Sequence, residues 1–393
     1  MGELDASQVD VLKSAAPHAF PGLDIIHSSP HVEYTDPFGL VDDAGLALEL
    51  NLAARDVGGS ELRSYTCVEK VDVVPDSHVT LTCRDVLTQS PVSLKAGCVV
   101  NAAGPGANAI ASMFSLDSAG DVVAPVGSFH AIVKVPDDGR HGKGRGKGWI
   151  DSSAGADGVL FAFPWRLGLA GGEPGYAYWL VGTTRAYDVE HLCPRVDAEI
   201  VEEVIGRMAE PLARDGVVDL SGGKVTSAWS AFRPLTKEGA EQGAQVSDHT
   251  IRADRDNRVV HVGGGKWTHC LLMADEVAAC VVDTFFAGGS GGRTRDTQPL
   301  VIPPSPIHGI TEDTMYSDAA VDVYLQSGAR HAIDVFARRT RGLVTDPEFF
   351  VSTREDDVVR VAQRVAGNLG GVAWDRQVED VLDAAHHLLP HRQ

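Results

Sequence analysis

Two glycine-rich turns, each between an apolar strand-like run and an apolar helix-like run, constrain this 393-residue chain more than any other feature. The first turn is Gly104-Pro105-Gly106 and the second is Gly263-Gly264-Gly265-Lys266. A strand that passes through glycines into a helix is the repeating unit of α/β proteins, and the glycines expose backbone N–H groups at the start of the helix. The two turns therefore predict an α/β fold whose ligand lies near these strand ends.

The rest of the chain gives this α/β fold some α+β character. Asp42 and Asp43 open an apolar helix that ends at Gly58-Gly59. Strand-like runs dominate from about residue 122, and the last ninety residues read as helices, one of them over about 319–341 and the last over about 374–389. We predict a partial α/β region over 1–121, an antiparallel sheet domain with a returning strand and helix over 122–286, a Gly/Pro-rich linker over 287–306, and a helical domain over 307–393.

Composition excludes several classes of protein. The net charge is −20, which disfavours nucleic-acid binding, and 44% hydrophobic residues disfavour a disordered chain. Six cysteines without a CxxC pair give no sign of a structural metal site or a disulfide scaffold. No apolar run reaches the ~20 residues of a membrane span. The acidic start, Met1 to Asp5, resembles neither a secretory signal nor a transit peptide, so we expect no targeting segment within the residues given.

Four basic or titratable side chains are candidates for a site. Lys266 ends the second glycine turn, where it suits a phosphate or another anion, or is simply a solvated lysine. Arg233 follows an apolar strand and is fixed by Pro234, so it could clamp an anion in a bidentate manner or form a structural salt bridge. His130 near a strand start could serve as a general base, and His269 competes with it for this role.

Taken in order, several segments resemble a known family. Val99-Val100-Asn101-Ala102-Ala103-Gly104-Pro105 is similar to the VVNA(A/T)GP element of the D-amino-acid-oxidase-like flavoproteins. Within that group, further segments resemble the FAD-dependent glycerol-3-phosphate dehydrogenases: Val181-Gly182-Thr183-Thr184, Ala228 to Leu235, Gly264-Gly265-Lys266-Trp267-Thr268 and Arg338-Arg339-Thr340-Arg341. The segment Val41-Asp42-Asp43-Ala44 resembles the family's DDAR stretch.

The resemblance implies a reaction, a cofactor and partners. It implies that FAD takes a hydride from sn-glycerol 3-phosphate, that dihydroxyacetone phosphate leaves, and that electrons pass to a quinone. It also implies peripheral association with the mitochondrial inner membrane, and it is compatible with a homodimer. His130 would be the base, and Arg233 and Lys266 would hold the substrate phosphate.

The same resemblance assigns the flavin contacts. Gly104, Pro105, Gly264, Gly265 and Thr268 would line the cofactor, and no metal is implied.

Departures from the family pattern keep two alternatives open. Nothing before Asp36 supplies the strand and GxGxxG that open the family's FAD domain, and Leu271, Ser247, Arg185 and Gly45 replace residues usual in the family. The chain could therefore be an N-terminally truncated, FAD-less and inactive fragment, or a different FAD oxidoreductase of the same superfamily. Without the first strand, we expect the parallel sheet to have an exposed edge and the isolated chain to be poorly stable or to aggregate.

Overall fold

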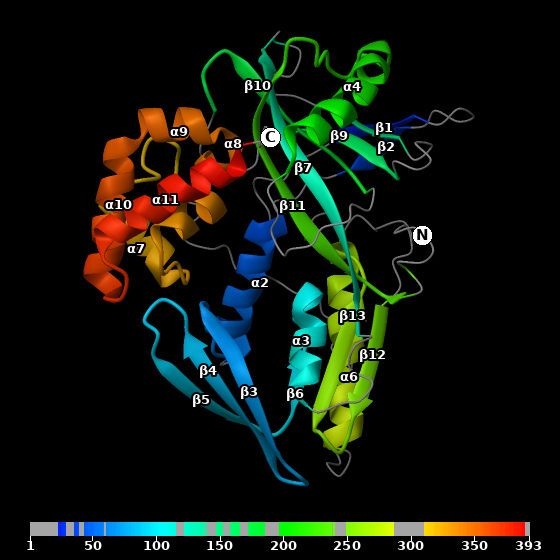
Figure 1. The fold of residues 1–393 in the computed structure, drawn as a ribbon, viewed down its shortest axis with the longest axis vertical. Helices are drawn as coiled ribbons and strands as arrows, with labels where there is room; N and C mark the ends of the chain where they lie inside the picture. Colours follow the sequence, from blue (N-terminus) through cyan, green and yellow to red (C-terminus); the bar gives the residue numbers. More distant parts are fainter. Residues whose placement is uncertain are drawn as a thin grey trace.

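The computed structural model shows a long sheet at one end, two small sheets at the other, and a bundle of helices beside them (Figure 1). The chain is described over residues 23–28, 35–38, 43–58, 60–114, 122–137, 139, 147–151, 158–165, 172–184, 196–237, 239, 249–286 and 310–389. The predicted linker 287–306 and the departures at Arg185 and Ser247 lie outside these residues.

A seven-stranded sheet provides the main scaffold. Its order is β11 (Lys224–Leu235), β7 (Ala124–Pro136), β10 (Tyr176–Thr183), β9 (Leu160–Pro164), β8 (Lys147–Asp151), β1 (Leu23–Ser28) and β2 (Thr35–Phe38). Neighbouring strands are antiparallel except β1 and β8. Helix α4 (Ala198–Arg214) buries Val201, Val204, Met208 and Leu212 against this sheet, at the spacing of one helical face.

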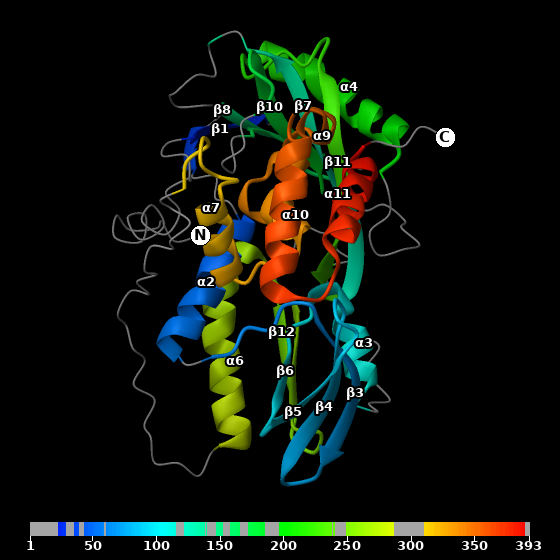
Figure 2. The same ribbon diagram turned by 90° about the vertical axis from the view of Figure 1, so that its left-hand side faces the viewer.

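A smaller sheet carries both glycine turns. Its order is β12 (His249–Asp254), β13 (Val259–Gly264) and β6 (Val99–Asn101), and β13 and β6 run parallel. Helix α3 (Ala107–Ser112) follows β6, and helix α6 (Cys270–Phe285) follows β13 and packs beside the sheet (Figure 2). This is the strand–glycine–helix arrangement that the sequence predicts.

One edge and one helix face of this sheet are uncovered. Among the described strands β6 is the last in its sheet, and Val100 on it is 43% exposed. Helix α6 buries no residue fully, and Leu271 on it is 59% exposed. In the part of the chain that the structure describes, the parallel strand β6 thus forms an open edge, as expected from the sequence.

A third sheet and helix α2 complete the part of the chain before residue 122. The sheet contains β3 (Thr66–Val74), β4 (His78–Asp85) and β5 (Pro91–Ala96), all antiparallel, and α2 spans Asp43–Gly58. The turn between β3 and β4 places Asp76 at φ 56°, as the turn residues of that segment predict. Its neighbour Ser77 donates its backbone N–H to the Val74 carbonyl at 3.1 Å.

The C-terminal bundle contains shorter helices than expected. Helix α7 covers Asp318–Gln326, a π-helix η6 covers Asp334–Arg339, and α8, α9, α10 and α11 cover Gly342–Thr345, Pro347–Thr353, Glu355–Leu369 and Trp374–Leu388. The prediction of a single helix over about 319–341 is therefore wrong. Gly328 at φ +85° ends α7, and the Asp334 carboxylate accepts the backbone N–H groups of Arg330 and His331 before η6 begins.

Residues 341–346 make the buried hydrogen bonds that join the helical bundle to the large sheet, and α9 and α11 also contact β11. Thr226 and Ser227 on β11 donate their hydroxyls to the carbonyls of Thr345 and Val344 at 2.7 and 2.5 Å. The indole of Trp165 donates to the Thr345 hydroxyl at 2.8 Å. These hydrogen bonds take the place of hydrogen bonds to water, both on the segment and on the sheet. They therefore fix which residues of the bundle lie against which residues of the sheet.

Asp346 adds a buried ion pair to this contact. Its carboxylate is 2.9 Å from the Lys134 ammonium and accepts the Tyr178 hydroxyl at 3.0 Å. Burial opposes the charge of Lys134, but hydrogen bonds to Glu173 and Asp346 outweigh it and raise the pKa of this lysine. Burial beside these carboxylates also raises the pKa of Tyr178, so the hydroxyl remains a donor.

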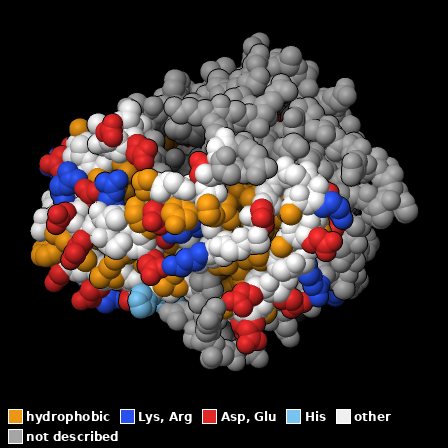
Figure 3. Space-filling model, turned by 90° about the horizontal axis from the view of Figure 1, so that it is seen from above, with side chains coloured by type: hydrophobic (Ala, Val, Ile, Leu, Met, Phe, Trp, Pro, Cys, Tyr) orange, Lys and Arg blue, Asp and Glu red, His pale blue; other side chains and the backbone are white. Residues whose placement is uncertain are grey.

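The surface seen from the sheet end mixes charges of both signs. On the described part of that face, Lys and Arg side chains lie singly among Asp and Glu (Figure 3). Among the described residues no helix is long and apolar enough to cross a membrane, and no cluster of His, Cys, Asp and Glu could hold a metal ion.

We expect Asp346→Asn to weaken the docking of the bundle. The amide cannot hold Lys134 and Tyr178 as a carboxylate does, and charged hydrogen bonds of this kind contribute about 1.5–3 kcal/mol. Urea unfolding should show a loss of that size for Asp346→Asn. The matched control is Asp383→Asn on the exposed face of α11, for which we expect less than about 0.5 kcal/mol. Equal unfolding midpoints for the two variants would contradict this account.

Candidate functional site

His130 lies on β7 inside a frame of aromatic rings. Trp229 is its partner on β11 and stacks with it at 5.8 Å between ring centroids, and Phe161 on β9 lies at 5.3 Å. The Nδ1 atom is buried and has no hydrogen-bond partner in the described part of the chain. Burial, with a smaller effect from the charge of Arg233, lowers the pKa of His130 to about 4 despite the opposing charge of Asp43. The ring is therefore neutral at neutral pH.

Arg233 lies on the same face of β11 as Trp229, four residues further along the strand. Its Nη2 donates to the Thr184 carbonyl, at the end of β10, at 2.6 Å. Burial lowers the pKa of Arg233 from its ordinary value, which is far above neutrality, so the guanidinium stays charged. The structure thus brings His130 and Arg233, which the sequence offered separately, to one place on the sheet.

Two further charged residues lie here that the sequence analysis did not assign to a site. Asp43 begins α2, and it is close enough to His130 to act on the ring electrostatically. Arg341, between η6 and α8, has its Nη2 3.9 Å from Oδ1 of Asp43. The only signal in the sequence was that both residues fall in segments of the family resemblance, because 298 positions separate them along the chain.

The glycine turns lie together at the carboxyl ends of β6 and β13, because these strands are parallel neighbours. Gly104, Gly264 and Gly265 have φ values of +55°, +74° and +84°, which glycine adopts without cost. Among the described residues, a Cβ on Gly104 would meet nothing within 4 Å, whereas one on Gly265 would lie 2.4 Å from the sulfur of Met273. The first turn therefore has open space beside its backbone, and the second is closely packed.

A buried pair behind the first turn fixes its shape. Asn101 donates from Nδ2 to the Ala107 carbonyl at 2.8 Å and lies 3.0 Å from Nδ1 of His261. Burial lowers the pKa of His261, and its Nε2 has no hydrogen-bond partner among the described residues. Sequence reasoning did not single out His261, since a lone histidine in a strand gives no signal.

The remaining candidates follow the second turn. Lys266 and Thr268 are exposed, and within the described chain neither side chain makes a hydrogen bond or an ion pair. Pro105 lies in the short 3-10 helix of the first turn, Gly104–Gly106. These residues lie on the glycine-turn side of the molecule, where β11, the strand that carries Arg233, contacts both the first turn and β13.

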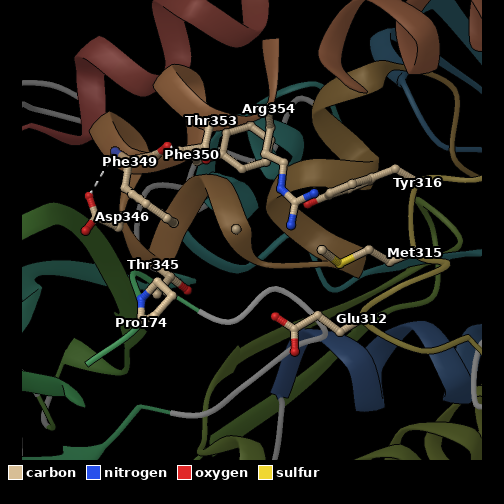
Figure 4. Close-up of a pocket in the computed structure, with 12 residues that line it drawn as sticks. Pro174, Glu312, Met315, Tyr316, Thr345, Asp346, Phe349, Phe350, Thr353 and Arg354 are labelled. Atoms are coloured by element: carbon tan, nitrogen blue, oxygen red, sulfur yellow. Dashed lines mark hydrogen bonds between the residues drawn. The ribbon is translucent and has the colours of Figure 1, made fainter. Parts of the chain in front are cut away.

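A separate cavity of about 190 Å³ lies beside the segment that docks the bundle (Figure 4). Met315, Tyr316 and Phe350 line it, and the Arg354 guanidinium lies 5.6 Å above the Tyr316 ring. Asp346 also lines it but is already held by Lys134 and Tyr178. None of the predicted site residues borders this cavity, so it is a gap at the junction of bundle and sheet.

Comparison with known proteins defines the family. Residues 3–280 match the family model described as FAD dependent oxidoreductase. The chain belongs to this family. The cofactor of the family is FAD, and the glycine turns fit such a group, because the open space beside Gly104 lets a ligand approach the backbone at two parallel strand ends.

Individual relatives share less than 30% sequence identity with this chain. The chain is similar to a probable mitochondrial glycerol-3-phosphate dehydrogenase of Caenorhabditis elegans, with 28% identity over 69% of this chain and 35% of the relative. It is also similar to the human mitochondrial glycerol-3-phosphate dehydrogenase, with 25% identity over 72% of this chain and 37% of the relative. The chain thus spans little more than a third of the length of these relatives.

A solved structure shares the fold. The glycerol-3-phosphate dehydrogenase of Bacillus halodurans, solved in complex with FAD, superimposes with a TM-score of 0.65 at 16% identity. The superposition covers 98% of this chain and 85% of that chain. It confirms the predicted combination of a partial FAD-binding domain, an antiparallel sheet and a helical domain as a flavoprotein fold.

Alanine should destabilise both glycine turns, but to different degrees. Gly104→Ala should cost about 1–2 kcal/mol of stability through backbone strain, and it should weaken FAD binding because the methyl group enters the open space. Gly265→Ala should cost about 1 kcal/mol more, because Met273 must also move. Urea unfolding and flavin titration would check both. A larger stability loss for Gly104→Ala than for Gly265→Ala would contradict this account.

Proposed function

We propose that this chain carries the substrate site of an FAD-dependent glycerol-3-phosphate dehydrogenase, which oxidises sn-glycerol 3-phosphate to dihydroxyacetone phosphate and passes electrons to a quinone. The observation that carries the proposal is the pair of His130 and Arg233 on one face of the sheet, a neutral base near a half-buried cation. The order of the family segments and the names of the relatives support the same substrate.

His130 would act on the substrate hydroxyl. Its buried Nδ1 lacks a partner among the described residues, and a substrate hydroxyl placed there would satisfy it and could give up its proton to it. A pKa of about 4 keeps the ring unprotonated but also makes it a weak base. A dianionic phosphate beside Arg233 would raise this pKa, so binding of the substrate itself would strengthen the base.

Arg233 and Lys266 would hold the phosphate. Arg233 is already oriented by Thr184, so less conformational freedom is lost when it binds an anion. Lys266 would close over the phosphate from the glycine-turn side. Leu271, where the family has an arginine, is 59% exposed and adds no charge.

The glycine turns would hold the flavin through Gly104, Pro105, Gly264, Gly265 and Thr268. When bound, FAD accepts the hydride from C2 of the substrate. A mitochondrial location is proposed because the human and mouse relatives are mitochondrial glycerol-3-phosphate dehydrogenases. A peripheral place at the inner membrane and a quinone as acceptor are proposed on the family resemblance. A homodimer is also proposed on the family resemblance.

A second candidate is a chain that cannot hold FAD unaided. In the described structure, the edge strand β6 and the exposed apolar residues of α6 favour it, because Val100 and Leu271 lie on the elements that carry the glycine turns and are 43% and 59% exposed. A third candidate is another FAD oxidoreductase of the same family, favoured by the exposed Leu271.

Visible absorbance of the purified chain separates the three candidates. The proposal predicts a bound flavin spectrum after addition of FAD and bleaching by glycerol 3-phosphate without oxygen. Arg233→Gln should raise the concentration of substrate needed for half-bleaching by about 10- to 100-fold, as expected for one charged contact to a phosphate. The control is Arg207→Gln on the exposed face of α4, which should change nothing.

The other outcomes are equally distinct. A flavin that is bleached by an amino acid but not by glycerol 3-phosphate would favour the third candidate. No flavin binding at any concentration would favour the second.

A further inference from the structure

The buried side chain of Asn101 spans the first glycine turn from its start to its end. Its Oδ1 accepts the backbone N–H of Ala103, just before the turn, at 3.4 Å, and its Nδ2 donates to the carbonyl of Ala107, just after the turn, at 2.8 Å. These two contacts fix the orientation of the amide, because the reverse orientation would place its oxygen against the Ala107 carbonyl. Nδ2 therefore has one hydrogen left to donate.

That second hydrogen faces the ring of His261. Nδ2 of Asn101 lies 3.0 Å from Nδ1 of His261, and the two residues are register partners on the parallel strands β6 and β13. Because the amide is the donor, Nδ1 has to be the acceptor, so the ring is neutral and carries its hydrogen on Nε2. Burial, with a smaller effect from the charge of Arg252, lowers the pKa of His261 against the charge of Asp254, which favours the neutral form.

The Nε2–H of His261 has no acceptor among the described residues. The residue is 1% exposed, and its ring meets Phe114 edge-on at 6.0 Å between centroids. A buried donor without a partner costs about 1–3 kcal/mol, so an apolar side chain would pack here at lower cost. The histidine is therefore better explained by what its Nδ1 does for Asn101 than by packing.

The pair of Asn101 and His261 stands where the two strands separate. The register of β6 with β13 runs from Val99 and Val259 to Asn101 and His261, and each strand then continues into its own glycine turn. The hydrogen bond between the two side chains is thus the last link between the strands before the turns begin. It sets the position of the first turn relative to the second.

We propose that Asn101 and His261 are positioning residues for the cofactor: Nδ1 of His261 holds the Asn101 amide, and the amide holds the first glycine turn in the shape that FAD needs, at a fixed distance from the second turn. The inference rests on the proposed binding of FAD at the two turns.

This arrangement depends on the protonation state of His261. A proton on Nδ1 would turn the acceptor into a donor that faces the donor of Asn101, and the amide would lose its hold. The charged groups near the ring are Arg252 and Asp254 of β12, since the sequences of β6 and α3 contain no titratable side chain. We therefore expect FAD affinity to weaken as the pH falls below the ordinary pKa of histidine, about 6.5.

The first test needs no FAD. The ring nitrogens of His261 are observed by NMR in the full chain with 15N-labelled histidine, assigned through His261→Asn. We expect a neutral ring at pH 7.5 with the hydrogen on Nε2 and a hydrogen-bonded Nδ1. A hydrogen on Nδ1, or a charged ring at this pH, would overturn the proposal.

The second test measures FAD affinity by flavin titration between pH 5 and 8. His261→Leu removes the acceptor and should weaken binding by roughly 3- to 10-fold at pH 7.5, as expected for one hydrogen bond. His261→Asn offers an oxygen in place of Nδ1 that takes up no proton, so it should bind FAD nearly as wild type does and lose the acid dependence. His386→Leu, on the exposed side of α11, is the matched control and should change nothing.

The outcomes separate this role from a purely structural one. Equal weakening in His261→Leu and His261→Asn, or an acid dependence that persists in His261→Asn, would overturn the proposal. The second comparison holds even if His261→Leu does not fold. Absence of FAD binding by the wild-type chain would overturn this proposal together with the proposed function. Bound FAD that glycerol 3-phosphate does not bleach would refute the proposed function alone.

Discussion

The contact between residues 341–346 and the large sheet is the interaction on which the rest of the structure depends. It joins two hydroxyls of β11, the indole of Trp165 and the buried pair of Lys134 and Asp346 to one short segment. A buried ion pair contributes little net stability compared with a well-packed apolar contact, but it fixes geometry, since any shift would leave a charge unpaired. We infer that this contact mainly fixes how the bundle is aligned with the sheet. This alignment places Arg341 beside Asp43.

The two ends of the molecule contribute different chemistry to one proposed reaction. The small sheet contributes backbone groups, which belong to glycines with positive φ at the ends of two parallel strands. Asn101 holds the first of these turns in shape. The large sheet offers side chains, with His130 and Arg233 on one face. The long strand β11 spans the two ends, as Figure 1 shows, and carries Arg233 close to its end. Among the described strands, β6 forms the edge of this small sheet.

Much of the fold and part of the site could be predicted from the sequence. Strand and helix periodicity located α2, β3, β13, α4 and α11, and the glycines located the two turns, because these signals are local. The break at Gly328 was missed, because a glycine inside an apolar helical pattern looks tolerable until its φ is known. Asp43, Arg341 and His261 were not assigned, because their significance comes from contacts between distant segments, which a pattern along the chain does not encode.

The most direct test of the account is hydrogen exchange of the full chain, measured by mass spectrometry with and without the Asp346→Asn substitution. The central claim is that the docking segment and the face of the sheet that carries His130 and Arg233 form one cooperative unit. It predicts that peptides covering residues 341–350 and residues 126–134 are protected to the same degree and lose protection together in Asp346→Asn. Unchanged protection of the β7 peptide, with the bundle alone exchanging faster, would contradict it.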